Sequence, residues 1–292
     1  INLIEFRKRV IMENIIITAD STCDLSHEIL EKYKNISIVP LYVNMDDKFY
    51  KDGVDITISD LFEYVDKTGK LPQTSAVSIS DYTAVFKELT NKGYSVIHIN
   101  IGSHFSCCHQ NALIAAEEFE NVYVVDSANL STGMGHLVIK GAELALKGMP
   151  AKDIYDELLN LVPRIESSFV LDSLDYLKMG GRCSSITAIG ANILGIKPCI
   201  EVREGKMHVG KKYRGKIKDR LSDYIKDRLS GRDDISYDRI FITHTSTNEI
   251  MEHAKNEVCK YSDFKEILTT TAGSTIASHC GPHTLGILFI RK

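Results

Sequence analysis

Short apolar runs alternate with longer amphipathic segments throughout the first half of the chain. Residues 15–25 begin as a β-branched run that predicts a buried strand, and residues 27–34 show the 3.6-residue spacing of a helix. Two further units of this kind cover residues 94–120 and 121–148. Strands and helices that alternate at this spacing favour right-handed crossovers and a mostly parallel sheet covered on both faces.

Three more elements are predicted between the first unit and the second. Residues 36–45 predict a single strand, because they form an almost continuous apolar run. Residues 58–67 and 80–93 have helical spacing, and each segment opens with a Ser-Asp pair suited to N-capping.

The pattern changes from about residue 165 to that of a mixed sheet. Glu204-Gly205 separates two short alternating runs and predicts a β-hairpin. A helix over 216–229, a strand over 239–246, another helix and two closing strands complete this part. We therefore expect two α/β domains.

The expected domains are residues 14–165, with the parallel sheet, and residues 166–292, with the mixed sheet. Residues 1–11 precede Met12 and predict no element, so we interpret them as an upstream extension outside the fold.

Composition and charge exclude several classes of protein. The 292 residues are 43% hydrophobic and 25% charged, as in ordinary globular proteins. A formal net charge of −4 without a basic stripe argues against nucleic-acid binding. No apolar run reaches the length of a membrane span and no secretory signal is recognisable, so we expect a cytoplasmic protein without stable membrane insertion.

Cysteines and histidines do not form a recognisable metal site. The seven cysteines include no C-x-x-C pair, which predicts reduced thiols. Two groups nevertheless contain metal-ligating residue types, but neither has a common zinc spacing: His104, Cys107, Cys108 and His109, and His279, Cys280 and His283. We expect no metal, and in the second group a histidine that donates to a ligand is the favoured interpretation.

Nucleotide-binding and nucleophile motifs are also missing from the sequence. There is no G-x-x-x-x-G-K-[ST] loop and no G-x-S-x-G elbow. Gly133-Met134-Gly135 begins like a dinucleotide fingerprint but lacks the third glycine, so a tight turn into a helix is favoured. We expect no cofactor.

Hydroxyl-bearing loops follow the predicted strands. In an open parallel sheet, ligands bind beyond the carboxyl ends of the strands, where hydroxyl donors and helix N-termini suit a small anion such as a carboxylate. Each loop taken alone is better explained as a helix N-cap, and only the five loops together make a ligand site an equal alternative. The loops are Asp20-Ser21-Thr22, Gln73-Thr74-Ser75, Gly102-Ser103 through Ser106, Asp126-Ser127 and Ser131-Thr132-Gly133.

In sequence and in order, these loops resemble those of the DegV family. Residues 71–78 look like the family's Thr-Ser-Gln-Pro-Ser loop, and residues 102–116 are similar to its Ser-x-x-Leu-Ser-Gly-Thr helix start. The most specific features are LDYLKMGGR at 174–182 and the GP-x-x-LG ending at 281–286. The resemblance covers residues 14–292. It departs from the family where Ala76-Val77 replaces Gln-Pro and where Cys107-Cys108 replaces Gly-Thr.

The resemblance implies a fold shared with the dihydroxyacetone-kinase substrate domain. In that fold a three-layer α/β/α domain with a mostly parallel sheet is joined to a two-layer α/β domain with a mixed sheet. A long-chain fatty acid is expected between the two domains. The resemblance places Thr74 and Ser106 at carboxylate-binding positions, with His279 in the same hydrogen-bond network.

Further residues are implicated by the same resemblance. Arg182 and Arg214 match arginines associated with shielding of the head group or with partner binding. Ile193, Leu194 and Ile196 would line the acyl tunnel, or they would simply fill a core.

The function implied is that of a carrier that is not catalytic alone. It would present the acyl chain to a separate ATP-binding fatty acid kinase subunit, which forms the acyl-phosphate. One alternative is an acyl hydrolase in which Ser106 and His279 act as nucleophile and base, oriented by Asp126 or Asp20. Another is a binder of small polyols like the kinase substrate domain.

Overall fold

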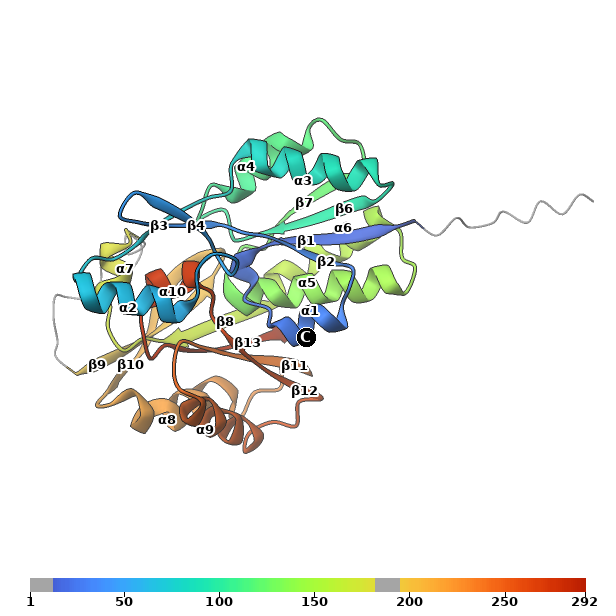
Figure 1. The fold of residues 1–292 in the computed structure, drawn as a ribbon. Coiled ribbons are helices and arrows are strands. Elements are labelled where there is room, and N and C mark those ends of the chain that lie inside the picture. Colours follow the sequence, from blue (N-terminus) through green and yellow to red (C-terminus); the bar gives the residue numbers. More distant parts are fainter. Residues whose placement is uncertain (1–12, 182–194) are drawn as a thin grey trace, which may run out of the picture.

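Three β-sheets and the helices packed on them make up the computed structural model, which describes residues 13–181 and 195–292 (Figure 1). The first sheet has the strand order β2-β1-β6-β7, and all its strands are parallel. Every residue of β6 is buried, as expected for a parallel strand with both faces covered. The strands are β1 (Ile15–Asp20), β2 (Ile36–Val39), β6 (Ser95–Asn100) and β7 (Val122–Asp126).

Helices cover both faces of this parallel sheet. In Figure 1, α3 and α4 lie above it and α5 lies below it; α6 packs against α5, β6 and β7. The helices are α1 (His27–Lys32), α3 (Ile79–Asn91), α4 (Cys108–Ala116), α5 (Ser131–Leu146) and α6 (Ala151–Leu161).

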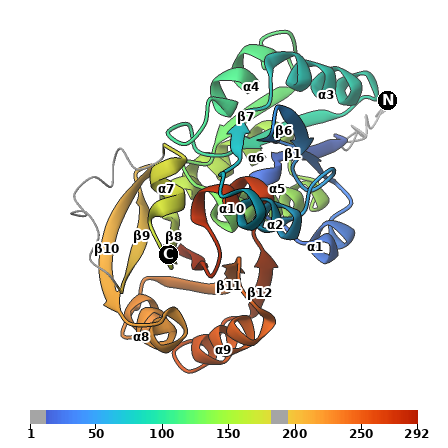
Figure 2. The ribbon, with the colours of Figure 1, turned by 60° about the vertical axis from the view of Figure 1, so that its left-hand side comes forward.

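The second sheet is mixed and has six strands in the order β10-β9-β8-β13-β11-β12. Only β11 and β12 are parallel neighbours; the other pairs are antiparallel. The strands are β8 (Ile165–Val170), β9 (Ile196–Arg203), β10 (Lys206–Arg214), β11 (Ile235–His244), β12 (Glu266–Thr271) and β13 (Leu285–Arg291). Helices α8 (Ile217–Leu229) and α9 (Asn248–Cys259) cover its outer face (Figure 2).

A small antiparallel sheet completes the fold. Its strands, in the order β4-β3-β5, are β4 (Lys48–Lys51), β3 (Tyr42–Met45) and β5 (Gln73–Ser75). Nearby helices are α2 (Ile58–Thr68), α7 (Asp175–Met179) and α10 (Ser274–Cys280). The parallel sheet and the mixed sheet confirm the predicted α/β fold class, whereas the division at residues 165 and 166 stays a prediction.

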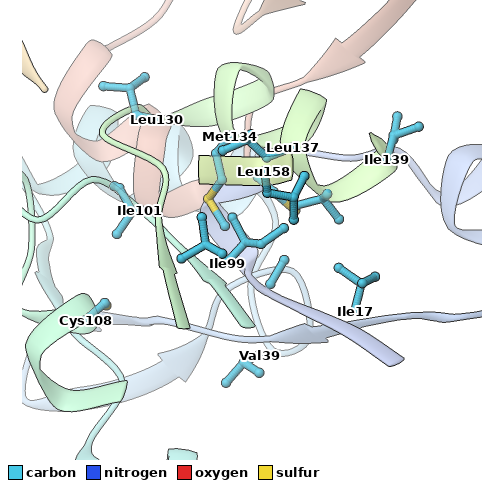
Figure 3. Close-up of a cluster of buried hydrophobic side chains, with 14 of the residues drawn as sticks. Ile17, Val39, Ile99, Ile101, Cys108, Leu130, Met134, Leu137, Ile139 and Leu158 are labelled. Atoms are coloured by element: carbon cyan, nitrogen blue, oxygen red, sulfur yellow. The ribbon is translucent and has the colours of Figure 1, made fainter. Parts of the chain in front are cut away.

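The helix α5 packs between the two large sheets. It contacts β1 and β6 on one side and β8, β11 and β13 on the other. Met134 and Leu137 of α5 lie in the buried cluster with Ile17, Ile99 and Leu158 (Figure 3). This shared core holds the two sheets in a fixed relation.

The glycine-rich start of α5 differs from the tight turn that was predicted. Gly133 lies inside the first turn of the helix, and a Cβ atom there would come within 2.3 Å of Asn129 Oδ1 and Ser167 Oγ. The glycine therefore permits close packing of the helix against its neighbours.

The single strand predicted over residues 36–45 is wrong. The chain forms β2 and β3 in two different sheets, with Pro40 and Leu41 between them. Proline has no N–H for a ladder and restricts the residue before it, so the apolar run is divided at this point.

The predicted N-caps are also corrected. Thr57 caps α2 in a capping box, where its hydroxyl accepts from Asp60 N and Asp60 Oδ2 accepts from Thr57 N at 2.9 Å. Ser78 caps α3 by accepting from Asp81 N at 3.1 Å. The Ser-Asp pairs lie inside the first turns, where the aspartates take the third helical position.

The predicted hairpin is confirmed as β9 and β10. Glu204 and Gly205 have φ of 50° and 72°, which are the two left-handed residues of a type I′ turn. A bulge between Val209 and Lys212 shifts the register of β10.

Candidate functional site

A cavity of about 50 Å³ lies where β5, the start of α4, α10 and the mixed sheet meet. Its lining includes Thr74, Ser106 and His279, the three residues that the family resemblance associates with a carboxylate. Most other lining side chains are apolar: Leu41, Ala76, Ile101, Phe105, Leu130, Phe169, Leu177, Met207 and Ile276. The cavity therefore combines a few polar groups with an apolar wall, which is typical of ligand sites.

Thr74 and His279 are in direct contact. Thr74 lies in β5, and Thr74 Oγ1 is 2.8 Å from His279 Nε2. His279 belongs to α10, which packs beside α2 and β3 although it is distant from them in sequence (Figures 1 and 2). Both side chains are half-buried.

The end of α7 explains part of the LDYLKMGGR motif. A Cβ atom at Gly180 would lie 2.3 Å from His279 Nδ1. Only a residue without a side chain lets the backbone approach the imidazole this closely.

Ser106 lies in the turn before α4, two residues ahead of the first helical residue, Cys108. Its hydroxyl accepts from Cys108 N at 3.3 Å and donates to Cys108 Sγ at 3.1 Å. Burial raises the pKa of the Cys108 thiol to about 12, so the sulfur is a neutral thiol at physiological pH.

Two buried aspartates, absent from the predicted site, anchor the N-terminus of α10. Asp24 Oδ1 accepts from Gly273 N and Asp52 Oδ1 accepts from Ser274 N, both at 2.8 Å. A Cβ atom at Gly273 would lie 3.2 Å from both carboxylates, so the glycine makes room for them. These contacts fix the helix that carries His279.

Asp24 has an unusual environment. Burial raises the pKa of its carboxyl to about 8, despite hydrogen bonds from Ser131 Oγ at 2.5 Å and from Gly273 N. The only sequence signal for this anchor was the position of Asp24 in the first loop after a strand, beside Asp20-Ser21-Thr22.

The other acidic residues of the hydroxyl loops hold the protein together internally. Asp20 is fully buried and accepts from Tyr82 Oη at 2.6 Å and from Ile101 N at 2.9 Å. Asp126 accepts from Ser103 N and Ala128 N. The predicted ligand loops thus divide into residues that line the cavity and residues that tie loops together.

The other residues that the family resemblance implicates either do not line the cavity or lie outside the described residues. Arg182, Ile193 and Leu194 lie outside the described residues. Ile196 is half-buried and is not among the described residues that line the cavity. It pairs with Arg214 across the β9–β10 ladder.

The bulge in β10 determines which way Arg214 faces. Met207, before the bulge, lies in the cavity wall, whereas Tyr213, after it, packs in the core under α8. Because neighbouring strand residues alternate between faces, Arg214 is turned to the cavity side of the sheet.

Within residues 13–181 and 195–292, no group of three or more His, Cys, Asp or Glu side chains is arranged to hold a metal ion. Over the same ranges, no helix is long and apolar enough to cross a membrane.

Comparison with known proteins identifies the family. The family described as uncharacterised protein, DegV family, matches residues 14–292. This chain belongs to the DegV family. A DegV domain-containing protein of Caldanaerobacter subterraneus is 33% identical over 285 residues, which cover 96% of this chain and 100% of the relative.

Solved structures of a DegV family protein and of a fatty-acid-binding protein have the same fold. One from Thermus thermophilus, described by its fatty acid binding, is 29% identical with a TM-score of 0.86, and the match covers 96% of this chain and 100% of that one. A stearic acid-binding protein from Eubacterium ventriosum is 27% identical with a TM-score of 0.80, over 95% and 98% of the two chains.

Proposed function

We propose that this DegV family member binds a long-chain fatty acid, with the carboxylate at Thr74, Ser106 and His279. The observation that carries the proposal is the convergence of these three side chains on one largely apolar cavity. The fatty acids bound by the DegV family protein of Thermus thermophilus and by the stearic acid-binding protein of Eubacterium ventriosum support it.

The acyl chain would need more space than the cavity provides. A single water occupies roughly 10–15 Å³ on this measure, so about 50 Å³ holds only a few water molecules. A second apolar cavity of about 20 Å³ shares Leu130, Phe169, Ile276 and Cys280 with the first. Displacement of these shared side chains would join the two cavities into a longer channel between α10 and the mixed sheet.

The orientation of the fatty acid follows from burial. Thr74, Ser106 and His279 are half-buried, whereas the second cavity is lined by buried residues such as Leu288 and Gly286. The carboxylate would therefore occupy the outer end and the methyl end would lie inside.

We further propose that the protein presents this outward carboxylate to a separate ATP-binding fatty acid kinase subunit. Phosphoryl transfer needs groups that hold ATP phosphates and Mg²⁺, and the sequence contains no phosphate-binding loop for them. If a separate kinase subunit binds ATP and this protein carries the fatty acid, both the outward carboxylate and the lack of a phosphate-binding loop are explained.

The described contacts favour the carrier over an acyl hydrolase. A hydrolase would need Ser106 paired with His279, but Ser106 bonds to Cys108 and His279 bonds to Thr74. Asp20 and Asp126, the candidate third members, are bonded elsewhere. The apolar lining is likewise poorly matched to a small polyol.

Mass spectrometry of lipid extracted from the purified protein tests the proposal. A long-chain fatty acid recovered in a constant ratio to protein supports the carrier. An empty protein that fails to bind added hexadecanoate but cleaves acyl esters would establish the hydrolase in its place.

A further inference from the structure

Thr275 lines the cavity, and its buried hydroxyl has no hydrogen-bond partner within the described part of the chain. It is the second residue of α10 and is only 3% exposed. A buried hydroxyl left without a partner costs about 1–3 kcal/mol, so native proteins rarely keep one without a reason. At the wall of a ligand cavity, the reason is a partner supplied by the ligand.

The position of Thr275 relative to His279 indicates which part of the ligand it meets. The two residues are four apart on one helix, so they share a face and their Cβ atoms are about 5–6 Å apart. His279 is half-buried and Thr275 is buried, which places Thr275 on the inner side. A carboxylate bound at His279 would bring the first carbons of the acyl chain beside the Thr275 hydroxyl.

We infer that Thr275 selects fatty acids that carry a hydroxyl group on one of the first carbons after the carboxylate. This inference rests on the proposed fatty-acid function and specifies its ligand class. A plain chain of methylenes leaves the Thr275 hydroxyl buried and unpaired, whereas a hydroxylated chain gives it a partner. Sites that contain a buried polar group discriminate against ligands that leave this group unpaired.

Binding of matched acids to the delipidated full-length protein tests the inference. Isothermal titration would compare hexadecanoate with hexadecanoates hydroxylated at the β carbon, at the δ carbon or at the methyl end. We expect the wild type to bind one of the two proximal isomers about fivefold more tightly than hexadecanoate, since one added hydrogen bond contributes about 1 kcal/mol. The isomer hydroxylated at the methyl end should show no such gain.

Three variants separate the hydroxyl from other effects. Thr275→Val keeps the shape of the side chain but removes its hydroxyl. The ratio of the affinities for the hydroxylated acid and for hexadecanoate should then fall to about one, while hexadecanoate binds as tightly as to the wild type or more tightly. Thr275→Ser should retain the preference. Ser278→Ala is the control on the same helix, because Ser278 Oγ already donates to Ser274 O at 2.7 Å.

The outcomes are distinct. An equal preference in wild type and Thr275→Val would overturn the inference and leave the proposed function intact. Tenfold weaker binding of hexadecanoate by Thr275→Val would also overturn it, because the hydroxyl would then hold the carboxylate. Failure of the wild type to bind any of these acids would remove the proposed function and the inference together.

Discussion

The side chains at the outer end of the cavity already have partners within the protein. Thr74 bonds to His279, and Ser106 bonds to the Cys108 thiol. A carboxylate would exchange these contacts for its own, and a hydrogen bond to a charged group contributes about 1.5–3 kcal/mol. Burial of the chain contributes about 0.8 kcal/mol per methylene, so a long chain supplies most of the affinity and the head group fixes the orientation.

Replacement of Ser106 by alanine should weaken fatty-acid binding about tenfold, because one hydroxyl donor to the carboxylate is lost. Thr74→Ala should have a smaller effect in the same direction. Titration of hexadecanoate into each delipidated variant measures the change.

Ser103→Ala is the matched control, since Ser103 lies in the same loop, is exposed and does not line the cavity. Affinity that is unchanged in Ser106→Ala would remove Ser106 from the carboxylate site. Ester cleavage by the wild type that disappears in Ser106→Ala, with binding retained, would identify a nucleophile.

The anchor of α10 connects the first loop of the chain with its last helix. Asp24 and Asp52 come from the first fifth of the sequence, and they hold the backbone of Gly273 and Ser274 more than 200 residues later. Because α10 carries both His279 and Thr275, this anchor sets the position of two proposed ligand contacts.

The free energy of unfolding should vary with pH because of Asp24. Its carboxyl keeps a proton up to about pH 8 in the folded protein but ionises near pH 4 in the unfolded chain. The folded state therefore binds more protons between these values, so this group's contribution to stability is full below about pH 4 and is lost as pH rises toward 8.

Asp24→Asn should remove this pH dependence, because the amide imitates the protonated carboxyl and its Nδ2 can donate to Ser131 Oγ. Relative to the wild type, the variant should gain about 1 kcal/mol of unfolding free energy per pH unit between about pH 6 and pH 8. Urea denaturation across this range measures the difference. Asp156→Asn, at an exposed position on α6, is the control for the loss of one carboxylate. If the unfolding free energies of Asp24→Asn and of the wild type depend on pH in the same way, the raised pKa of Asp24 is contradicted.

Local patterns predicted the elements well and the contacts between distant elements poorly. The hairpin at Glu204-Gly205 and the alternation of strands and helices are properties of neighbouring residues, so the sequence reveals them. The contact of Asp24 with Gly273 spans 249 positions and leaves no periodic trace. Pro40 is evident in the sequence. Whether it divides the apolar run between two sheets depends on which strands residues 42–45 pair with, and the sequence alone does not show this.

Family resemblance, not spacing, brought Thr74, Ser106 and His279 together as candidates. Hydroxyls at strand ends are common as helix caps, and Ser78 serves this purpose at the start of α3, whereas Asp126 ties two loops together. Nothing in the sequence indicated a role for Thr275, because the burial of its hydroxyl and its position at the cavity depend on the tertiary structure.

In the layered arrangement of the whole molecule, the mixed sheet would limit the depth of the proposed acyl site. The inner cavity is bounded by Leu288 of β13, which is only 2% exposed and does not line the outer cavity. The proposed channel would therefore end against this strand.

Leu288→Phe should shorten the longest chain that the protein accepts. The larger ring fills the inner cavity, so each methylene that loses its place there forfeits about 0.8 kcal/mol. Affinities for a series of saturated acids would show it: short acids bind as in the wild type, and long acids bind progressively more weakly. Leu288→Met conserves volume and is the control, and a uniform loss over all chain lengths would contradict the channel.

Presentation of the carboxylate to another protein requires a surface beside the outer end of the cavity. The β10 strand lies at the edge of the mixed sheet and exposes Lys211, Lys212 and Arg214, although the chain as a whole has a net charge of −4. A basic edge of this kind also discourages aggregation between sheets, so its charge alone does not identify a partner site. The bulge places Arg214 and Lys212 on the cavity side, whereas Lys211 lies on the other face and pairs with Asp227 of α8.

Arg214→Ala should leave fatty-acid binding unchanged and abolish phosphorylation when the protein is combined with ATP and a fatty acid kinase subunit from the same organism. Without the guanidinium, the growing negative charge of the acyl-phosphate loses a partner, and contact with the kinase subunit is weakened. Acyl-phosphate formation and hexadecanoate affinity are measured on the same preparation.

Lys206→Ala is the control, since Lys206 is exposed on the same strand but adjoins Met207 and so faces away from the cavity. Equal turnover in wild type and Arg214→Ala would exclude Arg214 from the transfer, and equal losses in both variants would reduce its role to general surface charge.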